Sequence, residues 1–166
     1  YPVIQGVVMF ISGVVLLAGG PGQAAAELGP YFFTLYPELR KKRDILLIDQ
    51  RGTGESNSMA CEQELKPLQS FELSGVTATE YYMDALKQCL NSLDADPAQY
   101  TTPIAMDDLE YIREILGYPQ LNLFGISYGT RAALVYLRRH PTSVRSMILD
   151  AVVPMDMLVP EHIATD

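Results

Sequence analysis

Gly125-Ile126-Ser127-Tyr128-Gly129 matches the pattern G-x-S-x-G. The apolar residues 121–124 before it predict a buried strand that breaks at the first glycine, and residues 127–139 predict a helix that ends before a proline. A serine on such a sharp strand-to-helix turn is lifted above the sheet, where its hydroxyl is a candidate nucleophile. The helix N-terminus behind it favours developing negative charge. The alternative is an ordinary serine N-cap after a glycine-rich turn.

Outward from this turn, strands and helices alternate along the chain. Continuous apolar runs predict further strands over residues 7–11, 14–18, 45–49 and within 144–153. Helices are expected within 24–36, from a Thr77/Glu80 capping box to Leu93, and from Thr102 to Gly117. The predicted apolar face of the helix that begins at Thr77 consists of Tyr82, Leu86, Cys89, Leu90 and Leu93. That of the helix that begins at Thr102 consists of Leu109, Ile112, Ile115 and Leu116. Such alternation predicts an α/β fold, with a mostly parallel sheet that has helices on both faces.

Charge and composition exclude several classes of function. The 166 residues carry a net charge of −8, which argues against a nucleic-acid partner. No segment fits a membrane span or a signal peptide, no C-x-x-C spacing indicates zinc, and no cofactor is expected.

Residues 55–114 hold twelve acidic and three basic side chains, which gives this stretch a net charge of −9. They predict either a solvated helical surface or an acidic rim that attracts amine-bearing substrates.

A second glycine-rich loop, Gly19-Gly20-Pro21-Gly22-Gln23, follows the strand at 14–18. As an oxyanion loop, it would offer a backbone N–H to a tetrahedral intermediate together with the N–H of Tyr128. As a dinucleotide loop, it would match G-x-G-x-x-A, with Asp49 as the ribose acceptor. Three observations count against the dinucleotide loop. Asp49 comes later in the sequence than the usual spacing of about 20 residues, Pro21 has no N–H to donate to a phosphate, and the serine turn is left unexplained.

Five segments occur in an order that resembles one family. They are 18–23 (AGGPGQ), 49–56 (DQRGTGES), 100–102 (YTT), 125–131 (GISYGTR) and 149–154 (LDAVVP). Together they resemble the α/β-hydrolase fold serine peptidases known as proline iminopeptidases and tripeptidyl aminopeptidases. The resemblance covers about residues 14–160. It departs from the family where Ala18 replaces a frequent His and Ala151 replaces a common Gly.

Carried over by position, the resemblance makes Ser127 the nucleophile. The backbone N–H groups of Gly20 and Tyr128 become the oxyanion donors, with Gly19 open as an alternative to Gly20. The Asp49–Ser56 loop resembles a support for the floor of the active site. From the residues alone, an ordinary surface turn with Arg51 paired to a carboxylate is equally open.

The acid and the base of a triad are expected beyond these motifs, because the order in this fold is Ser, then acid, then His. His140 ends the helix that starts at Ser127, about 20 Å away at 1.5 Å per residue. His162 lies where a lid should begin, and Asp150 and Asp156 follow the wrong strand. We therefore expect an incomplete fold without its C-terminal strands and lid. Residues 1–153 would be the N-terminal half of the core and 154–166 the start of a lid insertion.

Cys61 and Cys89 are 28 positions apart, and neither lies near a catalytic motif. The residues alone allow two free buried thiols. The resemblance to the secreted branch of the family favours a disulfide, which would imply a periplasmic or extracellular setting.

The expected function is a serine hydrolase that releases N-terminal residues, proline or short peptides, through an acyl-enzyme on Ser127. This chain alone would be inactive without the triad acid and base, and its expected partner is the missing C-terminal half. The alternatives are an esterase of the same fold acting on small esters, and a non-catalytic truncated domain.

Overall fold

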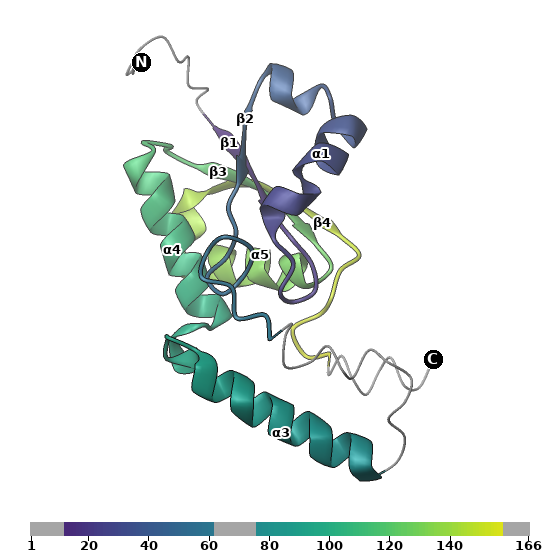
Figure 1. Cartoon of the computed structure of the whole chain (residues 1–166). Coiled ribbons are helices and arrows are strands. Elements are labelled where there is room, and N and C mark those ends of the chain that lie inside the picture. The colour runs from purple at the N-terminus through teal and green to yellow at the C-terminus, as the bar shows by residue number, and fades with distance from the viewer. Residues whose placement is uncertain (1–11, 62–75, 158–166) are drawn as a thin grey trace.

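A parallel sheet of four strands forms the centre of the computed structural model, which describes residues 12–61 and 76–157 (Figure 1). The strands are β1 (Gly13–Leu17), β2 (Asp44–Leu47), β3 (Leu121–Ile126) and β4 (Val144–Asp150), in the order β2-β1-β3-β4. All three neighbouring pairs run parallel. The predicted sheet is confirmed, although β3 continues through Gly125 to Ile126. The strand predicted at 7–11 lies outside the described residues.

Helices cover both faces of the sheet (Figure 1). Helix α1 (Ala25–Leu35) lies on one face, and α4 (Thr102–Ile115) and α5 (Tyr128–Arg139) lie on the other. Successive strand residues point to opposite faces, so Val14 and Leu16 pack toward α1, whereas Val15 and Leu17 pack toward α4 and α5. Both faces are therefore apolar, which explains the continuous hydrophobic runs. The described residues also include three short 3₁₀ turns, η1 (Leu39–Lys41), η3 (Pro97–Gln99) and η4 (Pro141–Ser143).

Helix α3 (Val76–Ser92) lies apart from the sheet and is linked to the loop after β2 by a disulfide between Cys61 and Cys89 (Figure 1). The Cα–Cα distance of 5.6 Å is typical of a disulfide. The helix already includes Val76, so the predicted cap at Thr77 is wrong by at least two residues. Its predicted apolar face is also wrong in part. Cys89 is buried, whereas Tyr82 and Leu90 are exposed, because α3 does not lie along the sheet.

The apolar face of α4 is offset from the predicted one. Ala105, Met106 and Leu109 are buried, whereas Ile115 is 66% exposed. Helix α5 ends beside the middle of α4, where Arg139 donates to the carboxylate of Asp107 at 2.6 Å. The last turn of α4 therefore extends past α5, which explains why the prediction failed there.

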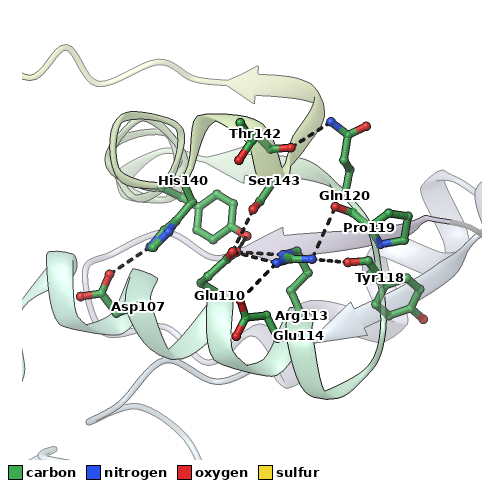
Figure 2. A network of polar contacts seen from close by, with 11 residues as sticks. Asp107, Glu110, Arg113, Glu114, Tyr118, Pro119, Gln120, His140, Thr142 and Ser143 are labelled. Atoms are coloured by element: carbon green, nitrogen blue, oxygen red, sulfur yellow. Dashed lines mark hydrogen bonds and ion pairs between the residues drawn. The ribbon is translucent and has the colours of Figure 1, made fainter.

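A network of polar contacts joins α4 to the C-terminal end of α5 and to the loops that enter β3 and β4 (Figure 2). Glu110 accepts hydrogen bonds from Arg113 at 2.8 and 2.9 Å, from the Tyr136 hydroxyl at 2.5 Å and from the Ser143 hydroxyl at 2.8 Å. The Arg113 guanidinium lowers the pKa of Glu110 to about 2, and the two hydroxyls add to the effect. Burial and the nearby carboxylate raise the pKa of Tyr136. Since the network lies where strands β3 and β4 begin, it stabilises the edge of the sheet opposite Ser127.

Candidate active site

Ser127 is the single residue between β3, which ends at Ile126, and α5, which begins at Tyr128. Its backbone has φ 54° and ψ −120°, in a region that side-chain-bearing residues adopt at a cost. The Ser127 side chain makes no capping hydrogen bond to the helix. The alternative of an ordinary N-cap is therefore wrong, and the hydroxyl is not used by the helix.

The two glycines of the pattern are required by close packing. A Cβ on Gly125 would lie 2.5 Å from the carbonyl oxygen of Gly129. A Cβ on Gly129 would overlap the carbonyl oxygen of Leu17 in β1. The first turn of α5 thus lies against the ends of β1 and β3, closer than any side chain would permit. The spacing G-x-S-x-G follows from this contact.

The backbone of Ser127 is fixed on both sides. Its N–H donates to the carbonyl of Asp150 at the end of β4, at 2.9 Å. Its carbonyl accepts from both the backbone N–H of Thr130 at 2.9 Å and the Thr130 hydroxyl at 2.6 Å. These contacts hold the positive φ in place. The sequence did not identify the role of the Thr130 hydroxyl. The one available signal was that Thr130 lies about one helical turn after Ser127.

The Gly19–Gln23 loop lies beside Ser127, because β1 and β3 are neighbours and Leu17 pairs with Gly125. A Cβ on Gly19 would lie 3.3 Å from Cβ of Ser127. Gly20 has φ 101°, and a Cβ there would lie 2.9 Å from the nitrogen of Gly22. The two glycine-rich turns predicted from the sequence therefore meet at the carboxyl ends of the strands.

The Asp49–Ser56 loop serves a structural role. The Asp49 carboxylate accepts from the backbone N–H of Ala26 in the first turn of α1 at 2.9 Å, and from that of Glu55 at 3.2 Å. Each oxygen of the Asp49 carboxylate thus holds one backbone N–H of the fold. Arg51 donates to both carboxylate oxygens of Asp108 at 2.6 and 2.7 Å, so the predicted pairing of Arg51 with a carboxylate is confirmed.

A cavity of about 180 Å³ lies between the Gly19–Gln23 loop, the Asp49–Ser56 loop and the start of α4. Tyr128 is on its wall, and the Tyr128 hydroxyl lies 2.6 Å from the Thr102 hydroxyl. This bond ties the serine turn to the predicted 100–102 segment. The sequence did not reveal the pairing, since the two residues lie 26 positions apart.

The described part of the chain places no histidine beside Ser127. His140, the one histidine in that part, caps the far end of α5, and its Nε2 lies 3.0 Å from Asp107. His162 lies outside the described residues, as do residues 158–166 of the predicted lid segment. Asp150 contacts Ser127 through its backbone carbonyl, which accepts from the Ser127 N–H.

Comparison with known proteins agrees with this geometry. The sequence model described as "alpha/beta hydrolase fold" matches residues 14–165. The chain belongs to the α/β-hydrolase fold family. Among solved structures, this α/β hydrolase resembles MGS-M2, an alpha/beta hydrolase enzyme from a Medee basin deep-sea metagenome library. The TM-score is 0.57 at 21% identity, covering 96% of this chain and 43% of the other, which supports the fold.

Relatives of this α/β hydrolase carry peptidase names. It is 32% identical over 155 residues to serine protease Hip1 of Mycobacterium tuberculosis (strain ATCC 25618 / H37Rv), covering 86% of this chain and 30% of the relative. It is 29% identical over 147 residues to tripeptidyl aminopeptidase of Streptomyces lividans, covering 81% and 27%. It is 31% identical over 136 residues to proline iminopeptidase of Arabidopsis thaliana, covering 82% and 25%. The predicted family is confirmed, and the chain spans less than a third of each relative's length.

Among the described residues, no helix combines the length and apolar character needed to cross a membrane.

Proposed function

We propose that the protein is a serine hydrolase that releases N-terminal residues from peptides through an acyl-enzyme on Ser127. The observation that carries the proposal is the backbone of Ser127, which has a positive φ although its hydroxyl caps nothing. Strain of this kind persists only where the surroundings impose it, and it is concentrated at functional sites. The peptidase names of the relatives support the choice of substrate.

In this proposal, the Ser127 hydroxyl attacks the carbonyl carbon of the scissile bond and forms a tetrahedral intermediate. The backbone N–H groups of Gly20 and Tyr128 donate to its oxyanion, with Gly19 as the alternative to Gly20. Each such donor is typically worth roughly 3 kcal/mol in the transition state. The N-terminus of α5 adds favourable partial charge. The base that takes the Ser127 proton would come from outside the described residues. It would pass that proton to the leaving amine as the C–N bond breaks and the intermediate collapses to the acyl-enzyme, which water then hydrolyses.

The test is labelling with a fluorophosphonate probe, followed by peptide mapping, on the longest natural chain that contains these residues. We expect one adduct on Ser127 and no adduct in Ser127→Ala. Ser58→Ala is the matched control, because Ser58 is an exposed loop serine, and it should label like the wild type. Labelling that survives Ser127→Ala would refute the assignment.

An esterase is the second candidate, because the serine turn and the adjacent glycine loop suit any acyl transfer. An aminoacyl arylamide and a simple aryl ester of matched leaving-group reactivity separate the two. Faster turnover of the arylamide, measured as kcat/KM, supports the aminopeptidase, whereas turnover of the ester alone supports the esterase. A non-catalytic domain would turn over neither substrate.

A further inference from the structure

The segment that leaves β4, residues 151–157, contacts the first turn of α5, which directly follows Ser127. We call it the exit segment. The N–H of Val153 donates to the hydroxyl of Thr130 at 3.0 Å. Arg131 donates to the carbonyls of Pro154, at 2.6 Å, and Met157. The first turn of α5 therefore holds the exit segment at three backbone groups.

Thr130 joins this segment directly to the proposed nucleophile. Its side chain is completely buried, and its hydroxyl donates to the carbonyl of Ser127 at 2.6 Å while accepting from Val153. A hydroxyl has one donor and two acceptor sites, so it can make both bonds at once. No apolar side chain of the same shape could make either.

The bridge acts on the strained residue itself. Ser127 is held at φ 54° by its N–H bond to Asp150 and by the two bonds from Thr130 to its carbonyl. Because the Thr130 hydroxyl is oriented by Val153, the exit segment fixes the direction of one of these bonds. Removing the hydroxyl would leave the half-buried Val153 N–H without that partner and would loosen the carbonyl of Ser127.

We propose that Thr130 is a positioning residue: through its hydroxyl, the exit segment holds Ser127 in the conformation needed for acylation. This inference rests on the proposed function. It assigns the exit segment a part in the reaction without contact to substrate. A displacement of about 1 Å at a reacting group can cost on the order of a hundredfold in rate, so loss of the bridge should slow acylation more than it weakens binding.

The test compares Thr130→Val, which keeps the shape and removes the hydroxyl, with Thr130→Ser, which keeps the hydroxyl. Both are made in the longest natural chain that contains these residues. We expect Thr130→Val to lower kcat and the rate of fluorophosphonate labelling roughly 10- to 100-fold, with KM within about twofold of the wild type. Thr130→Ser should stay within about threefold. Amide hydrogen exchange at Val153 should quicken in Thr130→Val alone.

The outcomes separate this proposal from the proposed function. A wild-type protein that fails to label on Ser127 overturns the proposed function, and the positioning role falls with it. If the wild type labels, normal acylation by Thr130→Val overturns the positioning role alone, and so does an equal loss in Thr130→Ser. If Thr130→Val does not fold, Arg131→Met and Arg131→Lys test the contact between Arg131 and the exit segment in the same way: one variant removes the donor and the other keeps it. The lysine can still donate to the two carbonyls, so only the methionine variant should slow acylation, and equal rates would overturn the role.

Discussion

Replacing Glu110 by Gln should destabilise the protein strongly, because this carboxylate is the centre of the polar network at the edge of the sheet opposite Ser127 (Figure 2). The side chain is only 16% exposed and accepts four hydrogen bonds, two of them from Arg113. Glutamine keeps the shape but brings an NH₂ group toward the guanidinium donors. Arg113 would then lose its main counter-charge in a partly buried position.

The magnitude follows from the pKa of Glu110, which the network lowers from 4.5 to about 2. At about 1.4 kcal/mol per pKa unit, the charged form contributes on the order of 3 kcal/mol to the free energy of unfolding at pH 7. Because the folded-state pKa is the lower one, this contribution is complete above the unfolded pKa and is lost as pH falls toward 2. At pH 3.5, about 1.4 kcal/mol of it should already be gone.

Urea denaturation followed by far-ultraviolet circular dichroism, at pH 7 and at pH 3.5, measures both effects. Glu114→Gln is the matched control, because Glu114 lies on the same helix, 3.6 Å from Arg113, but is 61% exposed. We expect it to cost less than about 0.5 kcal/mol. Equal losses in the two variants, or a Glu110→Gln loss that does not shrink at pH 3.5, would refute the reasoning.

Three further changes test other contacts by the same unfolding measurement. Gly129→Ala should cost about 3 kcal/mol or more, because its methyl group would overlap the carbonyl of Leu17, and a loss below about 1 kcal/mol would contradict the packing. The double variant Cys61→Ser/Cys89→Ser should lose roughly 3–4 kcal/mol, since the disulfide closes a loop with a separation of 28 residues. A reductant should lower the wild type to the same stability and leave the variant unchanged. Asp49→Ala should cost about 1–2 kcal/mol by uncapping α1, and an unchanged midpoint would show that the cap is dispensable.

The sequence predicted the sheet and the place of Ser127 because these depend on local signals. Apolar runs identify strands that are buried on both faces, and the two glycines mark where backbones come too close for side chains. The outer faces of helices were predicted less well, as Ile115 shows, because burial depends on where a neighbouring helix ends. Residues such as Thr130 and Glu110 were missed for a related reason. Their partners come from other elements, and a threonine or a glutamate on a helix has no pattern that identifies its partner.

The Glu110 network and the proposed nucleophile Ser127 lie at opposite ends of the strands. At one end, Glu110 has four donors, and its charge stabilises the fold in the ordinary way. At the other end, Ser127 has a costly backbone conformation and a hydroxyl that the helix does not use. The free energy that the Glu110 network contributes to folding offsets the cost of the strained backbone at Ser127. A variant such as Glu110→Gln should therefore lower the midpoint of unfolding while the folded protein still acylates at the normal rate. Thr130→Val, which acts on Ser127 itself, should slow acylation even where most of the protein remains folded.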